Sequence, residues 1–343
     1  MSLKDFSDNM MQPPDSWLDE FHTALSSWDG RYIVTSSDVD GFLSAAAICH
    51  HKRNSDTPAK IIGIYTTRHI VLFDNHSFQD ARDAIWLDHD ITQRDIICLG
   101  QHLLRVHPDD EIPTRNENSF NPNMWWPNLA YSNCFKGNAP GIDKFPFATI
   151  HYIMAGLNLP EPERGTIGYS LLAHADSAWA SGYNYNPNCR VWLEAMFDET
   201  NRIVNEISTQ TYCDATTRRA HGRLVRRLLS LGIRPTTSAT RQRPHIPSNW
   251  VVIEGNQTLT FAINSNHQSW MNRFQQVWSY ILDSMGWEAS TPSEITSVTS
   301  GDYNRDYPDR IEDLDELLLH EEVFSHAVTS QTEIKYTTNL HQI

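Results

Sequence analysis

The chain has 343 residues and a formal net charge of -15, and 40% of its residues are hydrophobic. This length accommodates two domains, and the composition is that of a globular protein rather than a disordered one. A chain this acidic does not coat duplex DNA through bulk attraction, so binding of nucleic acid requires a local basic patch.

The five cysteines are widely spaced and form neither a Cys-x-x-Cys pair nor a zinc-site pattern. We therefore expect reduced thiols in a cytoplasmic protein. Residues 1–15 are polar and acidic, and no apolar run is long enough to cross a bilayer. These features predict neither a signal peptide nor an association with membrane.

The first predicted element is an amphipathic helix that begins at Ser16 and ends before Asp29-Gly30. The apolar residues 32–34 then predict a buried strand, which leads to Asp38, Asp40 and a helix of small residues. Two carboxylates one residue apart at a strand end suit a hard divalent cation such as magnesium or manganese. The alternative is that one of them only caps the helix.

Four further apolar runs predict strands at residues 60–65, 70–73, 84–87 and 96–99, with a turn of helix at 91–95 before the last. This order predicts an α/β domain with a parallel sheet and helices on both faces. Residues 88–90 (Asp-His-Asp) and 100–102 (Gly-Gln-His) follow the last two strands. Three strand ends therefore carry groups that bind metals or protons.

Residues 103–145 lose hydrophobic periodicity and are rich in Asn, Pro and Trp. A loop of this length in a compact domain is usually functional or mobile. Its aromatic residues Trp125, Trp126 and Tyr131 have two interpretations, which are stacking on bases and anchoring of the loop to the core.

Helices are predicted next at residues 146–156, at 188–208 and at 218–229, and the segment 165–179 ends in His174-Ala-Asp176. The helix at 218–229 is strongly basic, which indicates either a solvated face or a patch that faces phosphates. The second interpretation makes five arginines the substrate-binding residues: Arg218, Arg219, Arg223, Arg226 and Arg227.

The composition changes from about residue 244. A hairpin is expected at residues 250–263, a helix at 270–287, a loop at 288–308 and an acidic helix at 309–327. We predict four regions: an arm and helix at 1–29, the α/β domain at 30–185, a helical connector at 186–243 and a smaller α+β C-terminal domain at 244–343.

Residues 30–180 resemble the DHH phosphoesterase superfamily, and its RecJ-like nucleases in particular, in four motifs that keep the family's order and spacing. The first motif is Asp38-Val-Asp40-Gly41, the second is Asp88, and the fourth is Asp176. The third motif, Asp-His-His in the family, falls on residues 100–102. The segments FNPNMWW and KFPFATIHYIMAGL also match the family's layout.

The chain departs from the family at several positions. Ser36 and Val34 stand where the family places a further ligand before its first motif, and the third motif has Gly and Gln in place of Asp and His. No Gly-Gly-Gly-His loop follows residue 244. A second alignment takes residues 88–90 as the third motif and Asp74 as the second, and His89 supplies an imidazole under either alignment.

The resemblance implies two-metal chemistry, in which carboxylates and a histidine bind divalent cations and activate water. It implies one or two manganese or magnesium ions. The implied catalytic residues and metal ligands are Asp38, Asp40, Asp88, His102 and Asp176, with His89 as a further ligand. The alternative for His102 is a hydrogen-bonded core histidine, and for Asp90 a helix cap.

Two functions follow from these observations. The first is a metal-dependent phosphodiesterase or nuclease that hydrolyses single-stranded nucleic acid or short nucleotides. The second is a catalytically decayed DHH-fold protein that binds a nucleotide or a protein partner without hydrolysis. The basic helix also allows a third, which is a homo-oligomer or partner interface formed with an acidic helix.

Overall fold

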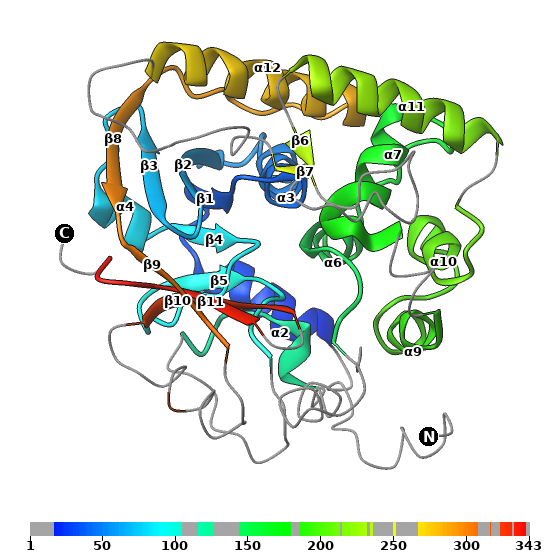
Figure 1. Ribbon diagram of the computed structural model, residues 1–343, viewed down its shortest axis with the longest axis horizontal. Coiled ribbons are helices and arrows are strands. Elements are labelled where there is room, and N and C mark those ends of the chain that lie inside the picture. The colour runs from blue at the N-terminus through cyan, green and yellow to red at the C-terminus, as the bar shows by residue number, and fades with distance from the viewer. Residues whose placement is uncertain are drawn as a thin grey trace.

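The computed structural model describes residues 17–104, 116–125, 144–179, 186–212, 215–231, 234–235, 250–251, 267–307, 316, 323–330 and 333–340. Its centre is a six-stranded sheet (Figure 1) built from β1 (Tyr32–Ser36), β2 (Lys60–Tyr65), β3 (His69–Phe73), β4 (Ile85–Leu87), β5 (Ile97–Leu99) and β8 (Ile295–Ser300). The strand order is β5-β4-β1-β2-β3-β8. Strands β5, β4, β1 and β2 are parallel, and β3 and β8 are antiparallel additions at one edge. The predicted α/β fold with a mostly parallel sheet is confirmed.

Helices cover one face of the sheet, and alternate residues of each strand point toward them. In β1, Ile33 belongs to this helical core, whereas Val34 points to the other face. The helices are α2 (Trp17–Ser27), α3 (Val39–His51), α6 (Thr149–Gly156), α7 (Ile167–His174), α9 (Asn186–Met196), α10 (Arg202–Ser208), α11 (Ala215–Ser230) and α12 (His267–Met285). The short α4 (Phe78–Arg82) packs on the other face through Ala81.

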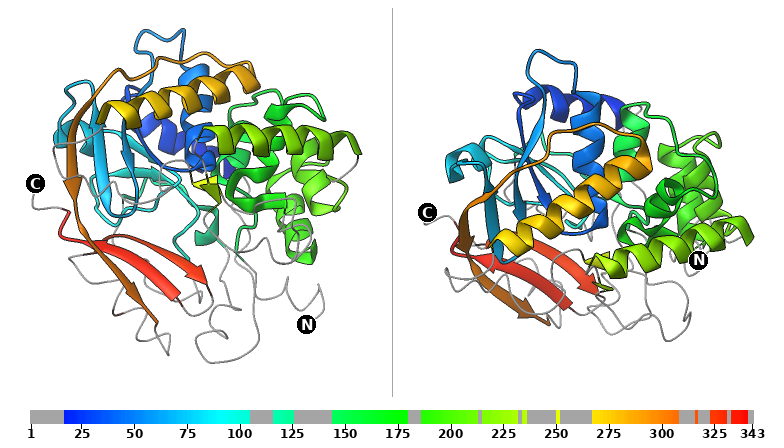
Figure 2. Two further views of the ribbon diagram at one scale, coloured as in Figure 1. Left: turned by 45° about the horizontal axis from the view of Figure 1, so that its top comes forward. Right: turned by 90° about the horizontal axis from the view of Figure 1, so that it is seen from above.

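A second, antiparallel sheet lies beside that other face, as the turned views in Figure 2 also show. It is formed by β9 (Asp302–Asp306), β10 (Val323–Ser330) and β11 (Glu333–Thr338) in the order β10-β11-β9. Phe324 docks it on the main sheet, with its ring 5.6 Å from that of Trp86 and 5.7 Å from that of Tyr65. This sheet is the smaller C-terminal unit that the sequence predicts.

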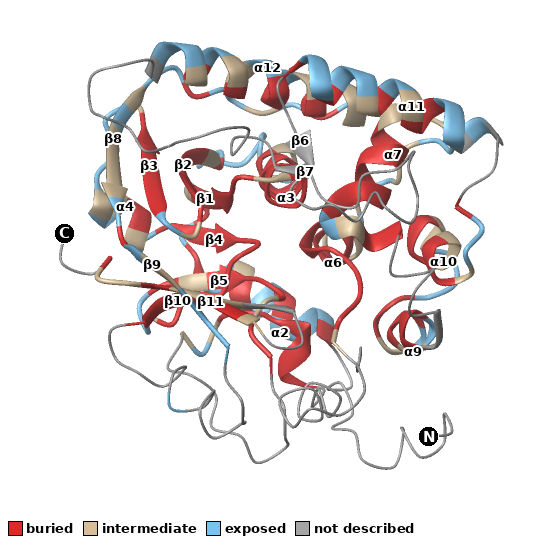
Figure 3. Cartoon of the chain, in the orientation of Figure 1, coloured by how far each residue is buried: buried red, intermediate tan, exposed pale blue. Residues whose placement is uncertain are grey.

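The chain enters this unit later than the predicted boundary at residue 244. Helix α12 packs on α3, where the ring of Phe274 lies 5.4 Å from that of Phe42, and β8 pairs with β3. Residues 267–300 therefore belong to the unit built on the main sheet. The aromatic face of α12 is buried against α3, and β8 extends the sheet itself. Figure 3 shows this face as buried and the outer faces of α11 and α12 as largely exposed.

Four predicted elements are wrong, in whole or in part. Residues 288–308 contain strands β8 and β9 rather than a loop, and residues 323–327 belong to β10 rather than to a helix. The predicted helix 188–208 divides into α9 and α10, because the Asp198 carboxylate accepts hydrogen bonds from the backbone of Thr200 and Asn201 and forms a turn. The predicted turn of helix at 91–95 is also absent, and Ile91 instead bridges to Ser325.

Parts of other predictions lie outside the described residues. Of the predicted hairpin, only β7 (Trp250–Val251) is described, and it pairs with β6 (Arg234–Pro235). Trp126 and Tyr131 also lie outside. Trp125 is buried and donates a hydrogen bond from its indole N–H to Glu20 at 2.9 Å, so it anchors its segment to the core. None of the described helices is long and apolar enough to cross a membrane.

Candidate functional site

The first carboxylate of the site caps α3. The Asp38 Oδ1 atom accepts a hydrogen bond from Gly41 N at 2.9 Å, and the Ser36 hydroxyl lies 2.8 Å from the same oxygen. Gly41 is needed for this close turn, since a Cβ atom there would lie 2.0 Å from Ser36 Oγ and 2.9 Å from Ser36 N. Burial and the charge of Asp176 raise the pKa of Asp38, while the bond from Gly41 opposes the rise.

The second carboxylate serves as the cap of a distant helix. Asp40 is fully buried and accepts hydrogen bonds from Thr149 N at 2.8 Å and Ile150 N at 2.9 Å, at the start of α6. The capping residue of α6 itself, Ala148, has no side chain that can do this. Burial, followed by the charges of Asp176 and Asp38, raises the pKa of Asp40 to about 8.

Asp88 connects the first motif to α6. It follows β4 with a φ of 59°, a left-handed conformation that is uncommon outside glycine and recurs at functional sites. Its carboxylate lies 2.6 Å from Ser36 Oγ and 3.1 Å from Thr149 Oγ1. Burial, then the charges of Asp40 and Asp38, raises the pKa of Asp88 well above its usual value.

The position of Ser36 between Asp38 and Asp88 has a consequence for charge. Its single hydroxyl proton can be donated to only one of the two carboxylates at a time. The other carboxylate must then share a proton or a cation, because two unscreened buried carboxylates repel each other strongly. Besides the Ser36 hydroxyl, the two carboxylates therefore need a bound proton or a cation between them.

Gln101 stands where the predicted alignment places the first histidine of the third motif. Its amide nitrogen donates to Asp176 Oδ2 at 2.7 Å and lies 3.5 Å from Asp40 Oδ2. The neutral amide thus bridges the carboxylates of the first and fourth motifs. Asp176 has a φ of 46° and is exposed, so it reaches Gln101 from a strained turn after α7.

Gly100 stands where the predicted alignment expects an aspartate, and its surroundings exclude a side chain. A Cβ atom at Gly100 would lie 2.5 Å from His89 O and 2.7 Å from Asp90 Oδ2, so no side chain fits there. The Asp90 carboxylate fills that space and accepts hydrogen bonds from His102 N at 2.7 Å and Leu103 N at 2.8 Å. Asp90 holds the chain after β5 rather than capping a helix.

Two imidazoles flank these carboxylates. His89 Nε2 donates to Tyr65 O at 3.0 Å, and burial lowers the pKa of His89 to about 3. His102 Nδ1 lies 3.9 Å from Asp88 Oδ1 and has no hydrogen-bond partner among the described residues. His102 therefore presents a nitrogen to Asp88 in a place where a cation can contact both.

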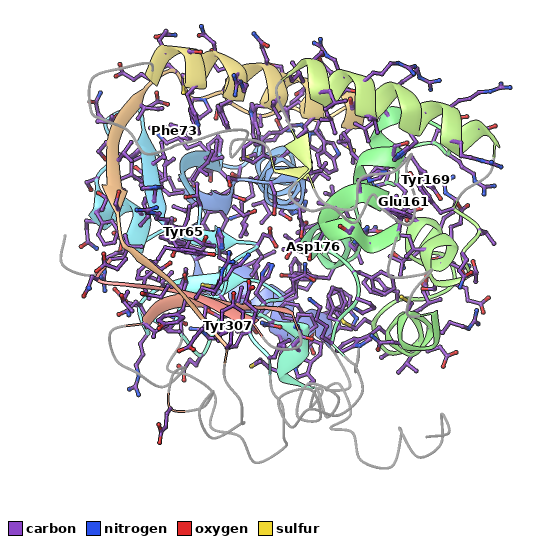
Figure 4. The ribbon with its side chains drawn as sticks, viewed as in Figure 1. Tyr65, Phe73, Glu161, Tyr169, Asp176 and Tyr307 are labelled. Carbon is purple, nitrogen blue, oxygen red and sulfur yellow. The ribbon has the colours of Figure 1, made fainter. Side chains whose placement is uncertain are left out.

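A cavity of about 510 Å³ opens on this edge of the sheet, between it and the C-terminal sheet. The edge contributes Asp38, Asp88, Asp90, His89 and His102 to its lining. Tyr65, labelled in Figure 4, lies between the two sheets, and its hydroxyl lies 2.6 Å from Ser325 Oγ on β10. The buried carboxylates of the site thus face a space large enough for a small ligand.

The other residues of the lining include cations and a histidine that the sequence analysis missed. The β2–β3 turn and the C-terminal sheet contribute Arg68, Arg305, Lys335 and His326. His326 had a signal in the sequence, since a strand places it on the same buried face as Phe324, two residues earlier. Thr149, whose hydroxyl contacts Asp88, had no signal in the sequence, because a threonine at the start of a helix is common.

Other predicted residues lie elsewhere. The five arginines from Arg218 to Arg227 lie on α11, and none of them lines the cavity. His174 hydrogen-bonds His221 in the core between α7 and α11. Asp74, the second motif in the alternative alignment, accepts hydrogen bonds from the backbone of Ser293 and Glu294 and lies outside the lining.

The carboxylate and imidazole groups of the site lie in two parts, one around Asp88 and one around Asp40. Among the described residues, no group of three or more His, Cys, Asp or Glu side chains is already arranged around a metal position. Asp38 and Asp88 both contact Ser36 Oγ, and His102 Nδ1 lies 3.9 Å from Asp88 Oδ1. The N–H groups of Thr149, Ile150 and Gln101 already occupy oxygens of Asp40 and Asp176, and N–H donors repel a cation.

Comparisons with protein-family models, with curated proteins and with solved structures find no match to this chain.

Proposed function

We propose that this chain is a DHH-like, metal-dependent phosphodiesterase that acts on short nucleotides or on the end of single-stranded nucleic acid. The observation that carries the proposal is the composition of the cavity. Three acidic and three basic side chains line it, namely Asp38, Asp88, Asp90, Arg68, Arg305 and Lys335. A phosphodiester with a divalent cation needs both signs of charge, one for the cation and one for the phosphate.

Asp38, Asp88 and His102 would hold the cation, which when bound polarises a phosphoryl oxygen and lowers the pKa of a water molecule. Ser36 and Thr149 fix the rotamer of Asp88 through their hydroxyl groups. Because Asp88 is buried and its backbone is strained, its carboxylate is held before any ligand arrives. Pre-organisation of this kind reduces the reorganisation needed in the transition state.

Binding without hydrolysis is the second candidate, and the surroundings of Asp40 favour it. Both Asp40 oxygens accept backbone hydrogen bonds, and the Gln101 amide lies near the same carboxylate. A site that retains a single cation loses the second ion that stabilises the leaving oxygen in two-metal enzymes. Such a protein would bind the nucleotide and leave it intact.

The deciding experiment incubates the protein with manganese and either short oligonucleotides or linear dinucleotides, and resolves products by chromatography. We expect metal-dependent products, and their loss in the double variant Asp38→Asn with Asp88→Asn. The matched control is Asp56→Asn, which removes an exposed carboxylate in the turn after α3. Tight binding of intact nucleotide with no product supports the second candidate. Products that persist in the double variant exclude the proposed site.

A further inference from the structure

The three basic side chains of the cavity differ in whether they form ion pairs within the protein. Arg305 Nε and Lys335 Nζ each lie 3.6 Å from Glu333 Oε1, so one carboxylate partly neutralises both. Arg68 is exposed and forms no ion pair with another described residue. The positive charge that remains available to a ligand in this cavity is therefore chiefly that of Arg68.

Arg68 is held by a strained and clamped turn. The preceding residue, Thr67, has a φ of 63°, which is a rare conformation for a β-branched residue. Gly301 N donates to Arg68 O at 2.8 Å, and the Thr337 hydroxyl donates to Thr67 O. Strain of this kind persists only where the surroundings impose it, and it clusters at ligand sites.

His326 is the second unexplained group. It is 4% exposed, it lines the same cavity, and neither ring nitrogen has a hydrogen-bond partner among the described residues. Burial lowers the pKa of His326 to about 4, so the ring is neutral near pH 7 and carries one N–H donor. A buried imidazole without a partner is unfavourable in the empty protein, and a ligand in the cavity can supply the missing acceptor.

We propose that Arg68 and His326 form a phosphate subsite, which holds the terminal phosphate of a phosphorylated dinucleotide or oligonucleotide end. This inference rests on the proposed function, because the phosphodiester would lie at Asp38 and Asp88 while the terminal phosphate occupies the subsite. A terminal phosphate is a dianion near neutral pH, so it gains more from an arginine fork and a neutral N–H donor than a diester does. The cavity of about 510 Å³ has the size of a site for a small ligand rather than for a duplex.

The test measures binding by calorimetry, with a dinucleotide whose linkage is a methylphosphonate and therefore resists hydrolysis. Three forms are compared, with a 5′-phosphate, with a 3′-phosphate and with neither. We expect one phosphorylated form to bind at least about tenfold more tightly than the bare form. Arg68→Ala and His326→Leu should abolish this preference, so that the phosphorylated forms lose at least about tenfold more affinity than the bare form does.

Two controls make the result specific. Arg53→Ala removes an exposed arginine that pairs with Glu288 away from the cavity, and it should leave the preference intact. His326→Gln retains an N–H donor and should restore part of the preference, and thermal melting checks that each His326 variant folds. Equal affinity for all three forms, absence of binding, or a preference that survives Arg68→Ala overturns the subsite. A preference without hydrolysis of a natural linkage refutes the proposed function and leaves the subsite standing.

Discussion

The buried cap made by Asp40 predicts an unusual dependence of stability on pH. Its pKa of about 8 in the folded protein compares with 3.8 for an ordinary aspartate. Between about pH 4 and pH 8 the folded state therefore keeps a proton that the unfolded chain has lost. Stability then falls as pH rises, by about 1.4 kcal/mol for each pH unit, or about 4 kcal/mol from pH 5 to pH 8.

Replacement by asparagine separates this effect from the others. The side chain of Asp40→Asn does not titrate. Its NH₂ group replaces one of the two oxygens that accept from Thr149 N and Ile150 N, so one of these hydrogen bonds is lost. This loss costs about 1.5–3 kcal/mol of unfolding free energy. We expect the variant to be less stable than the unsubstituted protein at pH 5 and more stable at pH 8. His89 and His151, whose pKa values burial lowers, remain in both proteins and cancel in the difference. The pKa of Asp88, which burial and then the charge of Asp40 raise, falls in the variant and weakens the pH dependence in the same direction.

The assay is urea unfolding followed by tryptophan fluorescence at pH 5, 6, 7 and 8, with a chelator present so that no divalent cation neutralises the carboxylates. Asp56→Asn, at an exposed site, should follow the unsubstituted protein at every pH. If the difference in unfolding free energy between Asp40→Asn and the unsubstituted protein stays constant over this range, the assignment of a buried, proton-holding Asp40 is refuted.

The remaining predictions concern packing and cation binding. Gly41→Ala should lower the free energy of unfolding by about 1–3 kcal/mol, since its Cβ would lie 2.0 Å from Ser36 Oγ. Gly222→Ala in α11 should raise the free energy of unfolding by about 1 kcal/mol, because the nearest atom to the added Cβ is the tip of Arg226 at 3.8 Å. Equal urea concentrations at the unfolding midpoints of the two variants would contradict both statements. Manganese at about 100 times its dissociation constant should raise the melting temperature by about 5 °C and leave Asp88→Asn unchanged; an equal rise in that variant places the ion elsewhere.

The sheet was predictable from the sequence because its signals are local. Strands β1, β2, β4 and β5 are short apolar runs bounded by polar turns, and parallel strands bring their carboxyl ends to one edge. That argument alone brings Asp38 and Asp88 together, and the structure joins them through one serine hydroxyl. Segments whose pattern agrees with their final environment can be assigned without knowledge of their partners.

The C-terminal sheet was not predictable in the same way. Residues of β10 show no regular alternation of apolar and polar types, and they follow an acidic stretch that favours a helix. Their strand state depends on pairing with β11 and on docking of Phe324. The error hid His326 from the sequence analysis. The hydrogen bond from Thr149 N to Asp40 joins residues 109 positions apart, and no local sequence pattern predicts a contact of that kind.

The central claim is that the edge of the sheet at Asp38 and Asp88 is a cation site. Anomalous diffraction from crystals soaked in manganese tests it most directly. We predict one ion for each chain, in contact with Asp38, Asp88 and His102, and none between Asp40 and Asp176. A map with no ion at Asp88, or with an ion bound through Asp40 and Asp176 instead, would contradict the account.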